Sequence, residues 1–209
     1  VKHIELVTDE VFKNLSDTQT PQGILALVKQ YHYTLEEVAG GSRKSAQAED
    51  LQEKPALLMV LETIQDPGNL GTILRAGEGA GVTGIVMDAN TADIYNPKVI
   101  RSTMGSVLRM PFVYVANLHE TLEELKKKKI RLFAAHLQGK HAYDQEDYTG
   151  PAAFLIGNEG NGLTEETAAM ADTYIRIPME GRVESLNAAV AASVLMFEAA
   201  RQRRNHTGK

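Results

Sequence analysis

From Pro55 onward, short apolar runs alternate with segments of helical spacing, and this alternation constrains the fold more than any other feature of the chain. Strands are expected at residues 56–61, 84–87, 112–115, 132–135, 153–156 and 174–177, and helices at 70–79, 96–103, 117–129, 165–171 and 186–204. Apolar strands separated by helices are typical of parallel sheets that are covered on both faces. The pattern therefore predicts an α/β fold with a mostly parallel sheet and helices on both of its faces.

The first 39 residues read as a separate small α+β unit. A helix at 9–15 lies between expected strands at 4–7 and 23–28. Two strands and one helix are too few to enclose a core, so we expect a truncated domain. Residues 40–54 are polar, open on two glycines and lack apolar periodicity, as linkers do. The expected division is therefore 1–39, a linker at 40–54, and a main domain at 55–209.

Composition excludes several classes of protein. The chain has no cysteine, which removes disulfides, thiolate zinc sites and cysteine nucleophiles. Its six histidines lack metal-ligand spacing, and we interpret His136 and His141 as ordinary loop residues. No apolar run approaches the roughly 20 residues that span a bilayer. We therefore expect a cytoplasmic protein without a metal or a membrane partner.

The net charge of −5 counts against a nucleic-acid partner, but the placement of the basic residues counts for one. Basic side chains gather at Arg43 and Lys44, and again at Lys98, Arg101 and Arg109. A locally basic face on an acidic protein is the expectation that follows.

Three Gly- and Asn-rich segments each follow an expected strand: 69–75, 155–163 and 185–187. Because ligands bind at the carboxyl ends of parallel strands, we expect one composite site. Asn69 can cap its helix, and Arg75 lies further along that helix, a pairing that suits a phosphate or a developing oxyanion. Ser185 can cap the last helix. The glycines at 77–81 have the wrong spacing for a dinucleotide fingerprint, although a nucleotide-cofactor oxidoreductase stays open as an alternative.

Taken in order, these segments resemble the three motifs of the SpoU/TrmH-type RNA ribose 2′-O-methyltransferases of the SPOUT superfamily. The resemblance rests on Asn69 to Arg75, on 156–160 (IGNEG), and on Ile177-Pro178 with 185–187 (SLN), and it covers about residues 55–204. Residues 20–24 (TPQGI) resemble the end of the small RNA-binding domain that many members carry.

The resemblance implies a C-terminal deep trefoil knot, S-adenosylmethionine as cofactor, and a homodimer formed through the C-terminal helix. It implies that Gly157, Ile177 and Leu186 contact the cofactor. The catalytic set that it implies is Asn69, Arg75, Glu159, Ser185 and Asn187. RNA would be bound by Arg43, Lys44, Lys98, Arg101 and Arg109.

In the expected mechanism Arg75 binds a phosphate and stabilises the emerging 2′ oxyanion, because a guanidinium keeps its proton in proteins and is a poor base. Glu159 would orient Arg75, while Ser185 and Asn187 would hold the loop and the target nucleotide. Ribosomal RNA is the expected substrate. Transfer RNA, or an inactive RNA-binding protein of the same fold, are the alternatives.

Overall fold

The structure, a computed structural model, describes residues 3–16, 18–40 and 54–206. Contacts between Cα atoms divide the chain into two compact units, Val1–Tyr31 and His32–Lys209. The break lies upstream of the boundary expected at residue 39. Most of the expected linker, residues 41–53, lies outside the described residues.

The described part of the first unit contains one helix, α1 (Asp9–Leu15), which begins after Thr8 because the Thr8 side chain accepts a hydrogen bond from the Val11 N–H group. The strands expected at 4–7 and 23–28 are wrong: both segments lie outside any strand. A strand needs a neighbour to pair with its backbone groups, and the described part of this unit offers none. Apolar side chains consequently stay exposed, with Leu6 at 98% and Leu27 at 97%.

The second unit is built on a seven-stranded sheet in the order β3-β2-β1-β6-β4-β7-β5. All six pairs of neighbouring strands are parallel, as expected. The strands are β1 (Leu57–Leu61), β2 (Gly84–Asp88), β3 (Phe112–Val115), β4 (Arg131–Ala135), β5 (His141–Ala142), β6 (Ala152–Ile156) and β7 (Thr173–Arg176). All residues of β1 and β6 are buried, which explains why these strands read as unbroken apolar runs.

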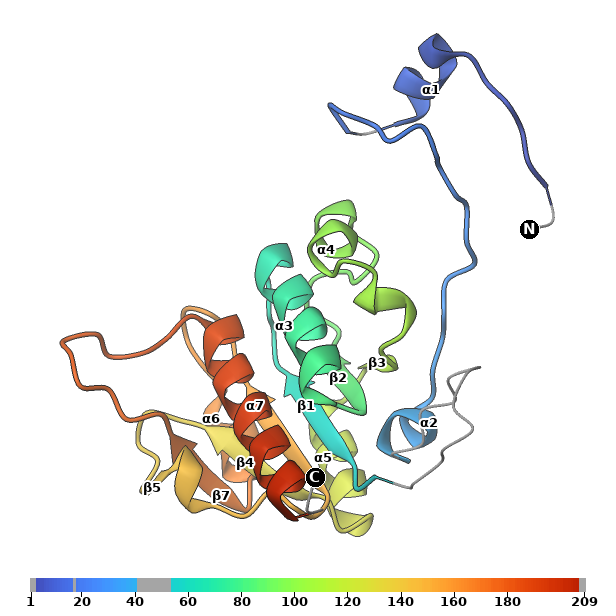
Figure 1. Cartoon of the computed structure of the whole chain (residues 1–209). Coiled ribbons are helices and arrows are strands. Elements are labelled where there is room, and N and C mark those ends of the chain that lie inside the picture. The colour runs from blue at the N-terminus through green and yellow to red at the C-terminus, as the bar shows by residue number, and fades with distance from the viewer. Residues whose placement is uncertain (1–2, 17, 41–53, 207–209) are drawn as a thin grey trace. The chain divides into compact units, whose positions relative to one another are not determined.

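Helices cover both faces of this sheet (Figure 1). On one face lie α3 (Pro67–Ala80), α4 (Pro97–Ser102) and α7 (Ala188–His206). A short 3₁₀ turn, η1 (Ser106–Leu108), follows α4 in the chain. On the other lie α2 (Leu35–Ala39), α5 (Leu118–Lys127) and α6 (Glu165–Ala169). A second 3₁₀ turn, η2 (Tyr143–Gln145), follows β5.

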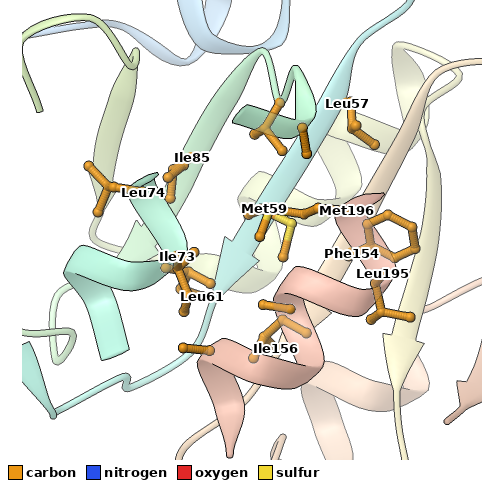
Figure 2. Close-up of a cluster of buried hydrophobic side chains, with 14 of the residues drawn as sticks. Leu57, Met59, Leu61, Ile73, Leu74, Ile85, Phe154, Ile156, Leu195 and Met196 are labelled. Atoms are coloured by element: carbon orange, nitrogen blue, oxygen red, sulfur yellow. The ribbon is translucent and has the colours of Figure 1, made fainter. Parts of the chain in front are cut away.

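The larger core lies between the sheet and the pair α3 and α7, which run side by side (Figures 1 and 2). Met59 and Phe154 from the sheet meet Leu195 and Met196 of α7 in this core. Val190 and Phe197 of α7 lie outside this core, and each is about half exposed, at 48% and 49%. The buried face of α7 consists largely of alanines, which let the helix approach the sheet closely.

Helix α3 is also tightly packed against α4. A Cβ on Gly71 would lie 1.6 Å from the Ser102 hydroxyl oxygen and 3.1 Å from the carbonyl oxygen of Val99. Only glycine allows this approach, so the cations of α4 are held close to the first half of α3.

The order of the strands determines where a ligand can bind. After β3 the chain crosses to β4 on the other half of the sheet, and β6 then inserts between β1 and β4. The register places Leu61, the last residue of β1, opposite Ile156, the last residue of β6. The loops that follow these strands therefore meet at one edge, at the point where the strand order reverses, which is where such sheets bind ligands.

Candidate active site

A cavity of about 600 Å³ lies at the carboxyl ends of β4, β6 and β7. It is lined by residues 135–138, 156–163, 175–179 and 184–186, together with Ala188, Ala191 and Leu195 of α7. Each of the first three segments is the continuation of a strand, so the sheet fixes the walls of the cavity. The predicted cofactor contacts Gly157, Ile177 and Leu186 all line it.

The loop after β6 is held in one shape by its own backbone. Asn158 and Gly162 exchange both backbone hydrogen bonds, at 3.0 and 2.9 Å. The Asn158 side-chain oxygen accepts from the N–H groups of Gly160 and Asn161. Gly157 is the residue that this turn crowds most, because a Cβ there would lie 2.1 Å from backbone atoms of Gly162 and Leu163. The Gly157 position therefore tolerates no side chain.

Three of the predicted catalytic residues are joined in one hydrogen-bonded series. The side-chain nitrogen of Asn187 donates to the side-chain oxygen of Asn69 at 2.9 Å. The side-chain nitrogen of Asn69 in turn donates to the Glu159 carboxylate at 3.0 Å. The three motifs expected to form one composite site are thus in direct contact, although they are separated by up to 118 residues.

The helix caps differ from those expected. Asp66, rather than Asn69, caps α3, and its carboxylate accepts from the Asn69 N–H group at 2.8 Å. Asn69 lies inside the first turn, and this frees its side chain to bridge the other two motifs. At α7 the capping contacts come from Asn187, whose side-chain oxygen accepts from the N–H groups of Ala189 and Val190. Ser185, the expected cap, lines the cavity instead.

Glu159 is held by the start of α3, and among the described residues no hydrogen bond or ion pair joins it to Arg75, the residue that it was expected to orient. Its carboxylate also accepts from the N–H groups of Gln65 and Asp66, at 3.3 and 3.1 Å. Partial burial alone would raise the pKa of Glu159, but the hydrogen bonds from Asn69 and from backbone N–H groups outweigh it and lower the pKa below the ordinary 4.5. The side chain is therefore an ionised acceptor at neutral pH.

Arg75 lies on α3 with an exposed side chain, and among the described residues it makes no hydrogen bond or ion pair. Lys98 and Arg101 are likewise exposed on α4, and no described residue forms an ion pair with them. These three cations lie on two helices that pack against each other, and they are available for an anionic ligand.

Arg109, which is also predicted to bind RNA, already has a partner within the chain. Arg109 is engaged by Glu78, to which its guanidinium donates through both Nε and Nη2, and this hydrogen bonding together with the attraction of the charge raises the pKa of Arg109. Ser106 donates to the same carboxylate. Arg109 is thus largely neutralised within the chain. Arg43 and Lys44 lie outside the described residues.

Sequence reasoning missed three charged or titratable residues that line the cavity: His136, Arg176 and Glu184. His136, interpreted as an ordinary loop residue, directly follows β4, and its ring contacts that of Tyr174 at a tilt of 43°, with centroids 5.1 Å apart. Arg176 ends β7. The available signal was a position immediately after a predicted strand for His136, and a position near the carboxyl end of a predicted strand for Arg176.

Comparison with known proteins decides the family. The SpoU rRNA Methylase family model matches residues 56–197, and a model described as RNA 2′-O ribose methyltransferase substrate binding matches residues 2–34. The chain belongs to the SpoU methylase family.

Individual relatives agree with this family. The chain is 31% identical to the 23S rRNA guanosine 2′-O-methyltransferase RlmP of Bacillus subtilis, over 92% of this chain and 70% of that protein. It is 34% identical to an uncharacterized tRNA/rRNA methyltransferase of Synechocystis, over 96% of this chain and 68% of that protein. The AdoMet-bound rRNA methyltransferase of Sinorhizobium meliloti has a similar structure, with a TM-score of 0.80 and 31% identity over 95% of this chain and 70% of that one.

Two further features are absent from the described residues. These residues contain no group of three or more His, Cys, Asp or Glu side chains that could hold a metal ion. No helix within the described ranges is both long enough and apolar enough to cross a membrane.

Proposed function

We propose that this chain transfers the methyl group of S-adenosylmethionine to a ribose 2′-hydroxyl group in structured ribosomal RNA. The observation that carries the proposal is the hydrogen-bonded series Asn187–Asn69–Glu159, which joins the three family motifs beside a cavity. A relative named as a 23S rRNA 2′-O-methyltransferase and the substrate-binding match at 2–34 support an RNA substrate.

The cavity fits the cofactor by the chemistry of its walls. Its volume of about 600 Å³ lies within the usual range for small-molecule sites. Ile177 and Leu186 offer apolar surface for an adenine ring. Glu184 offers a carboxylate to a cationic sulfonium or ammonium group, and Arg176 offers a guanidinium to a carboxylate. When bound there, the cofactor supplies an electrophilic methyl group.

The residues of the chain then orient the acceptor and stabilise its charge. Arg75 binds a phosphate next to the target ribose and stabilises negative charge as it develops on the 2′ oxygen. Glu159 holds Asn69 and the first turn of α3, so it fixes the helix that carries Arg75 without contacting Arg75 itself. Ser185, at the wall of the cavity, and Asn187 position the target nucleotide. Orientation of this kind supplies much of the rate of an in-line transfer.

RNA binds, in this proposal, across the exposed cations Arg75, Lys98 and Arg101 of α3 and α4. Arg43 and Lys44, which lie outside the described residues, also bind RNA in this proposal, whereas Arg109 contributes less because Glu78 already pairs with it. The unit Val1–Tyr31 contributes to substrate binding as part of a small RNA-binding domain. Loop nucleotides are the preferred target, since their sugar edges are accessible.

Three finer features belong to the same proposal. The loops between β6 and α7 form a deep trefoil knot, two copies associate through α7, and the enzyme acts in the cytoplasm. Family membership supports the knot. The half-exposed Val190 and Phe197 of α7 support the dimer, because paired apolar side chains on one helix face are typical of an interface.

A methyl-transfer assay with labelled S-adenosylmethionine tests the proposal. Purified protein is incubated with unmodified ribosomal and transfer RNA, and ribose methylation is mapped by resistance to alkaline hydrolysis. We expect label in ribosomal RNA, and a loss of about 10²-fold or more in the Arg75→Ala variant with little change in cofactor affinity. Near-normal turnover by Arg75→Ala would contradict the assignment of Arg75.

The other outcomes separate the alternatives. Label confined to transfer RNA supports a transfer RNA methyltransferase, an alternative favoured by the relative named for both substrates. Binding of RNA and cofactor without any transfer supports a non-catalytic protein of the same fold. The contact between Asn69, Glu159 and Asn187 argues against that reading, because an inactive protein has no need to keep it.

A further inference from the structure

We infer that Glu62 is a positioning residue for the loop 157–163, and that its buried carboxylate sets cofactor affinity without touching the cofactor. The inference rests on the proposed function, because this loop forms a wall of the cavity. Glu62 belongs to none of the three motifs and does not line the cavity.

Glu62 directly follows β1 and is only 8% exposed. Its backbone N–H group donates to the Ile156 carbonyl at 2.9 Å, which extends the pairing of β1 with β6 by one residue. Its carboxylate points to the segment that leaves the loop. There it accepts from the N–H group of Thr164 at 2.8 Å and from the Thr164 hydroxyl at 2.8 Å. The Thr167 hydroxyl also donates to it.

The adjacent residue, Thr63, holds the other end of the same loop. The Thr63 carbonyl accepts from the Asn158 side-chain nitrogen at 2.9 Å. Thr63 has a positive φ of 56°, which is unfavourable for a β-branched residue. Asp88 compensates, because its carboxylate accepts from both the Thr63 N–H group at 2.9 Å and the Thr63 hydroxyl at 2.8 Å.

Two consecutive residues at the end of β1 therefore anchor both stems of the loop. Asn158 enters the loop bound to Thr63, and Thr164 leaves it bound to Glu62. Glu159, which reaches Asn69, lies between these two anchors. Because the stems are fixed to one point of the sheet, the position of Glu159 depends on both.

Glu62 uses both oxygens of its carboxylate as acceptors in these contacts. Its three partners are all donors: one backbone N–H group and two hydroxyl groups. A glutamine in its place keeps an acceptor for the Thr164 N–H group, but its N–H₂ group faces the two hydroxyl groups, which must turn to accept from it, and the stronger hydrogen bonds that a carboxylate accepts are lost. His119 extends the network, since its Nε2 lies 3.2 Å from the Thr167 hydroxyl oxygen.

The test compares Glu62→Gln with Glu146→Gln in the full chain. Glu146 is a suitable control because its carboxylate, also mostly buried, holds Arg131 and His141 but does not contact the cavity. We expect Glu62→Gln to weaken S-adenosylmethionine binding about tenfold by calorimetry, with an equal rise in the KM for the cofactor and no change in the KM for RNA. In the cofactor-free protein, hydrogen exchange at residues 157–163 should rise in Glu62→Gln only.

A purely structural role for Glu62 would lower the melting temperature but leave the cofactor KM of the folded fraction unchanged. That result, or wild-type exchange in the loop, overturns the inference. Should Glu62→Gln fail to fold, Thr167→Val decides, since it removes one hydroxyl from the carboxylate and should raise the dissociation constant in the same direction. If the wild-type chain itself binds no S-adenosylmethionine, the proposed function fails and so does the effect on affinity, while hydrogen exchange in the cofactor-free protein still decides whether Glu62 positions the loop.

Discussion

At Gly157 a single added carbon meets the peptide bond between Gly162 and Leu163, and no side-chain rotation can relieve the contact. A Cβ would lie 2.1 Å from the carbonyl carbon of Gly162 and from the nitrogen of Leu163. We expect Gly157→Ala to lose about 1–3 kcal/mol of stability, because the loop must open to accept the methyl group. Cofactor binding should be lost with it, since this loop lines the cavity.

Thermal melting and calorimetric titration with S-adenosylmethionine measure both effects of Gly157→Ala. Gly150→Ala is the matched control, because a Cβ there meets nothing within 4 Å and the residue does not line the cavity. A Gly157→Ala protein that melts and binds like Gly150→Ala would show that the loop is less constrained than its contacts indicate.

Glu159 has a consequence for the pH dependence of stability. Its pKa in the folded protein lies below the ordinary 4.5, because the hydrogen bonds from Asn69 and the backbone outweigh the effect of burial. The ionised side chain therefore stabilises the fold at any pH above about 4.5, and this contribution is lost as the pH falls through the lower folded-state value.

The Glu159→Gln variant measures that contribution. We expect it to be about 1 kcal/mol less stable than the wild type at neutral pH, a modest value because solvent screens the exposed side chain. Urea unfolding at a series of pH values should show the difference shrinking below about pH 4.5. A difference that grows on acidification would have the wrong sign and would exclude the hydrogen bonds as its source.

At the level of secondary-structure elements, Asn187 both caps α7 and contacts α3, through different atoms of its side chain. Its side-chain oxygen caps α7 by accepting from the N–H groups of Ala189 and Val190, and its side-chain nitrogen donates to Asn69. Asn187→Asp keeps the cap but replaces the donor with a second acceptor, close to Asn69 and the ionised Glu159. We expect helix stability to be unchanged and methyl transfer to fall by about 10-fold or more.

Asn187→Ala is the comparison, because it removes the cap as well as the donor. It should lower stability by about 1 kcal/mol in addition to reducing transfer. Melting temperature and methyl-transfer rate, measured on both variants, separate the two tasks. Equal activity in Asn187→Asp and the wild type would mean that the contact with Asn69 does not serve the reaction.

The same elements show how far sequence alone could reach. Strands and helices from β1 onward were predictable, except for the two-residue strand β5, since the alternation of apolar runs and helical segments is a local property of the chain. Which of two nearby polar residues caps a helix was not predictable. Asp66 and Asn69 both suit the role, and the extended backbone of Asp66, with φ −75° and ψ 118°, decides between them.

The meeting of the three motifs at one site was predictable from the sequence, but which of their side chains contact one another was not. Parallel strands bring their carboxyl ends to one edge, so Asn69, Glu159 and Asn187 were expected to lie together. That Glu159 contacts Asn69 and not Arg75 depends on the rotation of α3 about its own axis, which long-range packing sets. The anchoring role of Glu62 was likewise not visible in the sequence, because its partners lie 102 and 105 residues away.

At the scale of the whole molecule, the two units differ in how completely they bury their apolar residues. The unit from His32 onward encloses two cores, one on each face of its sheet. The unit Val1–Tyr31 leaves Leu6 and Leu27 almost fully exposed. The expectation of two paired strands there was wrong, because a strand pattern in the sequence indicates which residues can pair but cannot supply a neighbouring strand.

The outer face of α7 offers the remaining test at this scale, since dimerisation is part of the proposed function. Val190 and Phe197 lie seven residues apart, two turns along one face of the helix, and each is about half exposed. We expect the wild-type chain to sediment with twice its mass of 22.9 kDa and the double variant Val190→Asp/Phe197→Asp to sediment as a monomer. Buried carboxylates without a partner would oppose association strongly.

Leu108→Asp is the control, because Leu108 is exposed to the same degree, 48%, but belongs to η1. A monomeric wild type, or a double variant that stays dimeric at the same protein concentration, would remove α7 from the interface.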